Sequence, residues 1–355
     1  MAAYLNRIST VVPPNDVHAQ FVAFAEGLLE GSRGLPLFER LVKRSQIDHR
    51  WSVLGGAEPF EPDGVQAAGF YRRGAFPSTA ERMRIYERFA PDLAERAVAG
   101  LELGAGADDI THVVITCCTG LSAPGIDLEL IARCGVRPSV ERTVIGFMGC
   151  YAAINALKLA RHMVRSEPSS RVLIVSLELC SLHLQETSDL EQVLSFLVFG
   201  DGCAAALVTA DPEGLSLDRF HAVVAPEARD QITWDIGDQG FNMVLSGQVP
   251  ASVGTALRAN EGAVLDGAPK ADIDLWAVHP GGRSVLDAVE SALSLPAPAL
   301  AASREVLRRY GNMSSATILF VLEAIMRDAA PGARGCAMAF GPGLTAETML
   351  FTVEG

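Results

Sequence analysis

The chain has 355 residues, of which 49% are hydrophobic and 20% are charged. This is the profile of an ordered protein that can bury one large core or two medium ones. The formal net charge is −13 and there is no run rich in Lys and Arg, which argues against nucleic acid or an anionic membrane as a partner.

The amino terminus, MAAYLNRISTVVPPND, lacks the basic and then apolar layout of a secretory signal. No apolar run approaches the ~18 residues needed to span a bilayer. We therefore expect a cytoplasmic protein without membrane insertion.

The cysteines are odd in number and form no CxxC pair. Such spacing suits neither a disulfide scaffold nor a zinc site, so we expect no bound metal. Most of them are predicted to be small buried hydrophobes, and at least one to be a nucleophile. The seven stand at positions 117, 118, 134, 150, 180, 203 and 336.

The first hundred residues are predicted to be mainly helical, with a loop from Gly55 to Gly64. From about residue 110, short β-rich runs alternate with helical stretches, which indicates parallel strands joined by crossover helices. In order, these elements are strand 111–117, helix 127–134, strand 142–147, a helix after Cys150, and strands 171–177 and 203–209.

A second α/β unit follows the turn residues Asp211 to Gly214. We therefore expect one domain over residues 1–212 and another over 213–355, with a shared layout but no residue-level repeat. The predicted elements of the second unit are strand 274–278, helices 283–293, 302–310 and 314–327, and closing strands 335–340 and 348–353.

Cys150 lies where a predicted strand meets an amphipathic helix, in GFMGCYAAINALKLARHMV (146–164). A sulfur at the start of a helix is close to the positive end of the helix dipole, which favours thiolate over thiol. Gly149 allows the sharp bend that this junction needs. A buried structural cysteine is the alternative interpretation.

Two further polar residues occupy similar junctions. His279 ends a strand and opens the turn HPGGR, and Asn312 in YGNMSS directly precedes a helix. Taken singly, His279 is better explained as a structural residue and Asn312 as a turn residue. Three such residues at the ends of elements are the layout of a site built at the carboxyl ends of strands, which favours catalysis.

The sequence resembles the type III polyketide synthases, the chalcone synthase family of the thiolase superfamily, from about residue 5 to the carboxyl terminus. Five motifs carry the resemblance, in the order and at the separations that the family shows: GFMGCYAA, VFGDGCAAALV, WAVHPGGRSVLDAVE, YGNMSSATILFVLE and AFGPGLTAETML. The resemblance implies an α/β fold, the duplicated, five-layered αβαβα thiolase type, and a homodimer. It implies acyl-CoA and malonyl-CoA as substrates, without a cofactor.

The resemblance also implies a catalytic triad of Cys150, His279 and Asn312, with Phe199 and Phe241 as the two gatekeeping aromatic residues. A thiolate paired with an imidazolium would take the starter acyl group from its thioester. The imidazole and the carboxamide would then stabilise the enolate formed when malonyl-CoA loses carbon dioxide. Phe199 would disfavour the malonyl carboxylate relative to neutral carbon dioxide.

Substrate contacts follow from the same resemblance. The pocket-lining positions of plant members correspond to Thr119, Cys180, His183 and Ala123, and the small side chain of Ala123 replaces a methionine that reaches in from the partner subunit. In AFGPG, Gly341 and Pro342 are predicted to bring backbone close to the substrate, a tight turn being the alternative. Coenzyme A phosphates are expected at Lys43, Arg44 and Arg50, for which a solvated helix face is the alternative.

ELCSLHLQ resembles bacterial members that make alkylpyrones or alkylresorcinols. We therefore expect a medium or long fatty acyl-CoA starter, extended by malonyl-CoA and cyclised to a pyrone or resorcinol. Two other hypotheses stay open: a β-ketoacyl-acyl carrier protein synthase III, which takes malonyl from a carrier protein, and a noncatalytic thiolase-fold scaffold.

Overall fold

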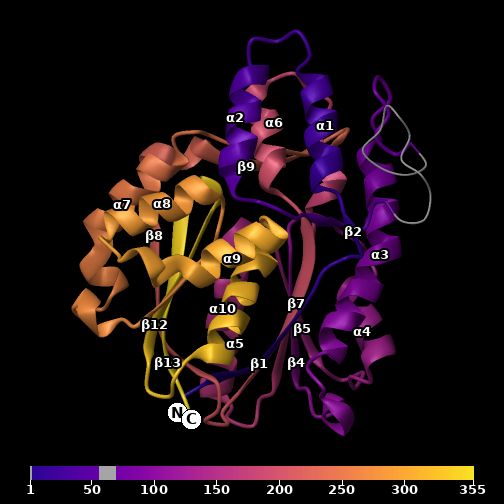
Figure 1. Cartoon of the computed structure of the whole chain (residues 1–355). Coiled ribbons are helices and arrows are strands. Elements are labelled where there is room, and N and C mark those ends of the chain that lie inside the picture. Colours follow the sequence, from indigo (N-terminus) through magenta and orange to yellow (C-terminus); the bar gives the residue numbers. More distant parts are fainter. Residues whose placement is uncertain (1, 56–68) are drawn as a thin grey trace.

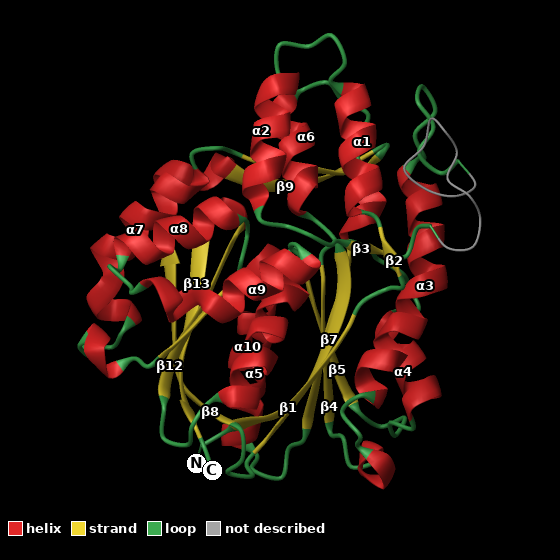
Figure 2. Ribbon diagram, viewed as in Figure 1, coloured by secondary structure: helices red, strands yellow, loops and turns green. Residues whose placement is uncertain are grey.

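The computed structural model describes residues 2–55 and 69–355, so nearly all of the predicted loop 55–64 lies outside the described residues. Figure 1 and Figure 2 show helices packed on both sides of a long twisted sheet and also within its fold. The helices are α1 (His18–Leu28), α2 (Leu35–Ser45), α3 (Thr79–Ala99), α4 (Ile126–Cys134), α5 (Ala152–Ser166), α6 (Leu190–Val198), α7 (Val249–Val264), α8 (Arg283–Ala292), α9 (Ala301–Tyr310) and α10 (Thr317–Asp328).

The strands form one nine-stranded mixed sheet and two short pairs. The large sheet has the order β11-β12-β13-β8-β1-β7-β6-β4-β5, and the pairs are β9-β10 and β2-β3. The strands are β1 (Tyr4–Val11), β2 (Asn15–Asp16), β3 (Trp51–Ser52), β4 (His112–Cys117), β5 (Glu141–Gly146), β6 (Val172–Leu179), β7 (Asp201–Thr209), β8 (Leu215–Val224), β9 (Ile232–Gly237), β10 (Gly240–Leu245), β11 (Leu275–Val278), β12 (Arg334–Gly341) and β13 (Thr345–Val353).

The large sheet consists of two parts that meet only at β1 and β8. These two strands pair at just two positions, Tyr4 with Ser216 and Leu5 with Leu215. In Figure 2 the parts diverge from this junction, with α5 and α10 between them. Strand β4 runs parallel to β5 and β6, as the crossover pattern predicts, whereas β6 and β7 are antiparallel.

Successive side chains of a strand face opposite sides of the sheet, so the buried apolar residues form three separate cores. Successive side chains of β6 face opposite ways, so Leu173 packs toward α3 and α4 whereas Ile174 packs toward α5 and α10. Strand β12 behaves likewise: Ala337 joins the core around α5 and α10, and Met338 joins the core under α7 and α8. Helices outside, two sheet parts and helices between them make up the five layers expected of a thiolase-type α/β fold.

The amino-terminal region departs from the prediction. Helices α1, α2 and α3 are present, but Tyr4–Val11 forms strand β1 in the middle of the large sheet, paired along its length with β7. Only Leu5 of this strand is fully buried, so the local sequence shows little of the apolar alternation typical of a central strand.

Among the described residues, no helix is both long and apolar enough to cross a bilayer.

Candidate active site

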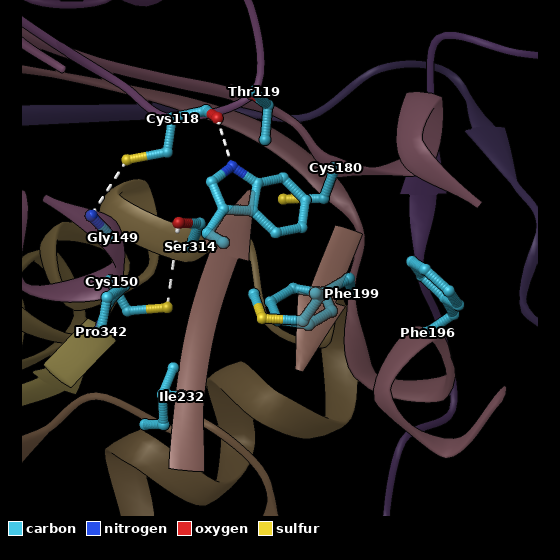
Figure 3. A pocket seen from close by; sticks show the side chains of 12 residues that line it. Cys118, Thr119, Gly149, Cys150, Cys180, Phe196, Phe199, Ile232, Ser314 and Pro342 are labelled. Atoms are coloured by element: carbon cyan, nitrogen blue, oxygen red, sulfur yellow. Dashed lines mark hydrogen bonds between the residues drawn. The ribbon is translucent and has the colours of Figure 1, made fainter. Parts of the chain in front are cut away.

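A cavity lies beside Cys150 and Ser314, and neither His279 nor Asn312 is among its lining residues. Figure 3 shows the side chains of Cys150, Ser314 and Phe199 around it, contributed by segments far apart in the chain. The full lining is Cys118, Thr119, Gly149, Cys150, Cys180, Phe196, Phe199, Ile232, Trp234, Met243, Ser314 and Pro342.

Cys150 lies in a short 3₁₀ turn, Gly149–Tyr151, that leads directly into α5. The turn is tight because Phe147 and Gly149 have positive φ angles of 57° and 75°. The Gly149 N–H donates a hydrogen bond to Cys118 Sγ at 3.0 Å, and the Cys150 thiol donates to Ser314 Oγ at 3.8 Å (Figure 3). The junction that the sequence predicts is therefore present, and it points the sulfur into the cavity.

The protonation state of Cys150 differs from the prediction. Burial raises the pKa of its thiol to about 12, and hydrogen bonds from Ser314 and Asn312 only partly offset this effect. The expected preference for thiolate is therefore wrong for the resting site, because the loss of water outweighs the dipole of a helix that begins with a 3₁₀ turn. The Cys150 side chain therefore rests as a neutral thiol.

Asn312 is held rigidly beside Phe199. The Asn312 N–H donates to Val198 O at 2.7 Å, and Gly200 N–H donates to Asn312 O at 2.9 Å, which makes an isolated parallel bridge between Phe199 and Asn312. The side-chain Oδ1 accepts a hydrogen bond from Ser314 N at 2.8 Å. The carboxamide orientation is thereby fixed, and its Nδ2 group faces Cys150 and Gly281 O.

His279 follows β11 and precedes α8, at the position predicted for it. Its backbone N–H donates to Met338 O at 2.8 Å, and its side chain is buried. Within the described part of the chain neither ring nitrogen has a hydrogen-bond partner. Burial lowers the pKa of this imidazole to about 3, so it rests neutral and is not paired with a thiolate. Asn312 Nδ2–H donates to the backbone oxygen of Gly281, two residues after His279, at 3.4 Å.

Three of the predicted substrate contacts line the cavity in addition to Phe199: Thr119, Cys180 and Pro342. Gly341 lies behind the wall, where an added Cβ would come within 2.7 Å of Tyr151 Cδ1 and 3.3 Å of Cys150 N. Its lack of a side chain therefore allows β12 to pass close to the turn that carries Cys150.

Phe241, His183 and Ala123 are not among the lining residues. The Phe241 ring stacks on His183 with 4.2 Å between centroids, and both side chains are buried. His183 Nε2–H donates to Thr119 O at 2.7 Å and its Nδ1 accepts from Phe241 N at 3.0 Å, so the ring is a neutral bridge behind the wall. Ala123 is exposed, outside the cavity of its own chain.

Of the three basic residues expected to bind coenzyme A, Arg50 is placed differently from the prediction. Its guanidinium is buried, and Nη1 donates to Phe196 O at 2.8 Å and Phe199 O at 2.7 Å at the end of α6. Arg50 is thus a structural residue and not a surface phosphate ligand. Lys43 and Arg44 are exposed at the end of α2.

Sequence reasoning missed the polar residues behind the cavity wall. Glu178 at the end of β6 is fully buried, and its Oε2 accepts from Cys118 N at 3.0 Å and Thr119 Oγ1 at 2.8 Å. Ser315 Oγ donates to its Oε1 at 2.5 Å. Burial raises the pKa of this carboxyl to about 7. The charged residue inside the apolar run VLIVSLEL was the available signal.

Metal ligation finds no support in the described ranges, which contain no group of three or more His, Cys, Asp or Glu placed to hold an ion. The expectation that catalysis needs no metal or cofactor stays a prediction.

Comparisons with known proteins agree with this geometry. Residues 35–212 match the family model for the amino-terminal domain of chalcone and stilbene synthases, and residues 218–353 match the model for the carboxyl-terminal domain. An alpha-pyrone synthesis polyketide synthase-like protein, Pks18 of Mycobacterium tuberculosis, is 36% identical over 289 residues, which cover 77% of this chain and 73% of that protein.

Bisdemethoxycurcumin synthase of rice is also 36% identical, over 296 residues covering 77% of this chain and 74% of that enzyme. Among solved structures, 1,3,6,8-tetrahydroxynaphthalene synthase from Streptomyces coelicolor superposes with a TM-score of 0.88, at 29% identity and with 99% of both chains covered.

Proposed function

The chain belongs to the chalcone and stilbene synthase family of type III polyketide synthases, and from this premise we propose that it extends an aliphatic acyl-CoA starter. Malonyl-CoA supplies the extender units, and the product closes to a pyrone or resorcinol. The choice of an aliphatic starter rests on one observation: a second apolar cavity lies behind the first.

The second cavity adjoins the cavity around Cys150 and shares Cys180, Phe196 and Phe199 with it. Its other walls are mostly apolar and include Val17, Phe21, Arg50, Ser52, Leu54, Tyr71, Ser181 and Leu184. An acyl chain held on Cys150 would pass Cys180 into this space. Each methylene buried there adds about 0.8 kcal/mol, roughly fourfold in binding.

We assign the first chemical step to Cys150 and His279. The sulfur attacks the thioester carbonyl of the starter, the bond from that carbonyl to the CoA sulfur breaks, and acyl-Cys150 forms. His279, neutral and without a hydrogen-bond partner among the described residues, accepts the thiol proton on Nε2 and keeps it, while the departing CoA thiolate takes a proton from solvent. Two neutral groups thus become a charged pair only during the reaction.

Decarboxylation then generates the carbon nucleophile. The bond between C2 and the carboxylate of malonyl-CoA breaks, carbon dioxide leaves, and the electron pair forms an enolate whose oxygen accepts from Asn312 Nδ2–H and His279 Nε2–H. C2 attacks the acyl carbonyl and the bond to sulfur breaks. The product is a β-ketoacyl-CoA longer by two carbons, and the released Cys150 thiolate takes back its proton from His279 Nε2. Phe199, bridged to Asn312, gives the departing carboxylate an apolar surface.

Coenzyme A docking is assigned to a solvent-open groove of about 2080 Å³ between α2, α6, β10 and α8. Arg44 and Arg283 line it, and so do Gly281 and Gly282, which lead toward His279. The proposed phosphate ligands are accordingly Lys43, Arg44 and Arg283. Arg50 is removed from that set by its burial.

We further propose a homodimer formed through the edge of the sheet. Strand β5 is the last strand on that side, and Val144 on it is 55% exposed. Leu121, Met148 and Ala123 are exposed on neighbouring segments. An unpaired edge with apolar side chains is a surface for pairing with a second copy. Val144→Lys is expected to shift the mass measured by light scattering from two chains to one. The two domains, 1–212 and 213–355, are proposed as the halves of each subunit.

A starter panel tests the proposed function. Purified protein is incubated with malonyl-CoA and acetyl-CoA, medium-chain acyl-CoA, long-chain acyl-CoA or p-coumaroyl-CoA, and products are identified by mass spectrometry. Aliphatic starters are expected to outcompete p-coumaroyl-CoA. Cys180→Phe, which fills the passage between the cavities, is expected to abolish the preference for long chains while acetyl-CoA is still extended.

Three outcomes contradict all or part of the proposal, and a parallel incubation with malonyl-acyl carrier protein in place of malonyl-CoA is needed for the first. Extension only from malonyl-acyl carrier protein would assign the chain to the carrier-dependent reaction, and absence of any product with the whole panel would favour a noncatalytic scaffold. A preference for the aromatic starter would remove the aliphatic assignment alone.

A further inference from the structure

The second cavity, reached past Cys180, contains a polar group that the surrounding protein does not satisfy. Arg50 lines this cavity and is only 3% exposed. Its Nη1 donates to the backbone oxygens of Phe196 and Phe199, and its Nε donates to His18 Nδ1 at 2.9 Å. Its Nη2 is buried and has no hydrogen-bond partner among the described residues. A buried donor without a partner is costly, so this nitrogen marks a place for an acceptor atom.

The guanidinium group of Arg50 is fixed in position. Its Cζ lies 4.3 Å from the centroid of the Phe21 ring, which also lines the cavity. An added Cβ at Gly311 would come within 2.9 Å of Arg50 Cγ, so the stem of the side chain is tightly enclosed as well. The hydrogen bonds made by Nε and Nη1 set the plane of the group. Nη2 is therefore held in place before any ligand arrives.

The positive charge of Arg50 already has negative charges near it. Burial lowers the pKa of Arg50 to about 9, so the group stays protonated at neutral pH, and Asp16 and Asp201 act on this pKa in the opposite direction. The Asp201 carboxyl group is buried and accepts from Ser181 N at 2.7 Å and from Val53 N at 3.0 Å. These two carboxylates would repel a third, so Nη2 suits a neutral oxygen better than a ligand carboxylate.

A hydroxyl group can accept from Arg50 Nη2, and it also needs an acceptor for its own proton. Ser52 Oγ, in the wall of the same cavity, can be that acceptor. The Ser181 hydroxyl donates to Asp201 Oδ2 at 2.7 Å, so Ser52 is the donor in its 2.6 Å contact with Ser181 Oγ. Ser52 Oγ accepts from Leu54 N at 3.0 Å, and a hydroxyl oxygen has a second lone pair. The cavity therefore offers both the donor and the acceptor that a hydroxyl group requires.

We propose that Arg50 selects a starter acyl-CoA whose aliphatic tail carries a hydroxyl group. This inference rests on the proposed function and narrows its substrate class. With the acyl carbon held on Cys150, the tail passes Cys180, and its hydroxyl oxygen accepts from Arg50 Nη2 inside the second cavity. Nη1 meanwhile supports the end of α6, so one side chain both stabilises the cavity wall and recognises the tail.

Starters with a terminal hydroxyl group test this role on the full-length protein. Each ω-hydroxyacyl-CoA of a series of increasing chain length competes with the unsubstituted acyl-CoA of the same length, and mass spectrometry quantifies the two products formed with malonyl-CoA. At the length at which the hydroxyl group reaches Nη2, the hydroxylated starter is expected to win by about tenfold or more, as for a hydrogen bond to a charged group. An ω-carboxyacyl-CoA of that length is expected to compete poorly.

Arg50→Met removes the donor, and it is expected to bring the ratio of the two products to about one or below. Both products form in one mixture, so this ratio does not depend on the fraction of the variant that is folded. Arg165→Met, at the exposed end of α5, is the matched control and should keep the wild-type ratio. Cys180→Phe, which fills the passage, is expected to remove the preference for the hydroxylated starter.

Three outcomes would overturn the inference and leave the proposed function intact, because aliphatic starters are still extended in each. The unsubstituted starter competes equally or better at every length, which would leave Nη2 to a bound water molecule; the preference survives in Arg50→Met; or the carboxylated starter outcompetes the hydroxylated one. The wild-type series is decisive even if Arg50→Met does not fold. A wild-type protein that forms no product from any starter would overturn both proposals, so the two failures are distinguishable.

Discussion

The turn that carries Cys150, the proposed nucleophile, gives the sharpest quantitative prediction, through Gly149→Ala. Gly149 has a φ of 75°, and an added Cβ would lie 2.2 Å from Pro342 Cδ. Ordinary contact for a Cβ begins at 3.4 Å, so the turn or the proline must move by about 1.2 Å, the difference between 3.4 and 2.2. A displacement of this size at a reacting group costs about 10²-fold in rate.

Gly135→Ala is the matched control for backbone strain. Gly135 ends α4 with a φ of 69°, and an added Cβ would meet nothing within 4 Å. Both variants therefore incur the left-handed penalty of about 1 to 2 kcal/mol, but only Gly149→Ala adds the collision. Gly135→Ala is expected to keep wild-type kcat/KM, whereas Gly149→Ala loses about 10²-fold.

The assay combines urea unfolding with malonyl-CoA turnover on both variants. Subtracting the Gly135→Ala loss in unfolding free energy from the Gly149→Ala loss isolates the contact with Pro342. Equal losses of stability and full activity in both variants would refute the reasoning, since it would mean that the turn around Cys150 tolerates displacement.

Three further predictions follow from buried polar groups. Glu178 has a pKa of about 7 in the fold, against an ordinary value of 4.5, so the native state binds this proton more tightly than the unfolded state does. The free energy of unfolding should therefore fall by about 3 kcal/mol as the pH rises from 4.5 to 7. Glu178→Gln should remove that decline in urea titrations at pH 5, 6 and 7, and parallel curves for both proteins would contradict it. Asn312→Asp puts a negative charge where an oxyanion forms, so the rate of malonyl-CoA decarboxylation should drop about 10²-fold or more. Cys150 should still take up the starter acyl group. Equal loss of both steps would argue against the oxyanion role. Arg50→Met leaves two carbonyl groups at the end of α6 without their hydrogen-bond donor and should lower the free energy of unfolding by about 3 kcal/mol. Arg44→Ala should instead raise KM for malonyl-CoA. The reverse pattern would restore Arg50 as a coenzyme A ligand.

Local patterns were sufficient for most of the α/β framework. The predicted strand 111–117 is β4, and the predicted helix 283–293 is α8 with one residue fewer. Strand β1 escaped prediction because only Leu5 is fully buried and because its pairing with β7 joins residues about 200 positions apart. A strand stabilised mainly by distant partners carries little signal in its own sequence.

Burial and charge state were likewise decided by distant neighbours. Arg50 has the sequence context of a surface basic residue, yet it bonds to Phe199 O, 149 positions away. Cys150 was correctly predicted at the junction before α5, but the sequence suggested a thiolate where burial gives a neutral thiol. The pKa of a group depends on all the atoms that exclude water from it, and these come from the whole chain.

The sequence by itself determined the strands and helices on either side of the junctions at Cys150, His279 and Asn312, and it determined the family, because propensity, periodicity and motif order are properties of neighbouring residues. Only the tertiary structure decided which of those junction residues share one cavity, which aromatic rings line it and which lie behind it, and which ionisable groups are neutral. Cavity lining and charge state depend on packing between residues that are distant in the chain. Cys150 and Ser314, for example, are 164 positions apart and meet only when the two sheet parts pack around α5 and α10.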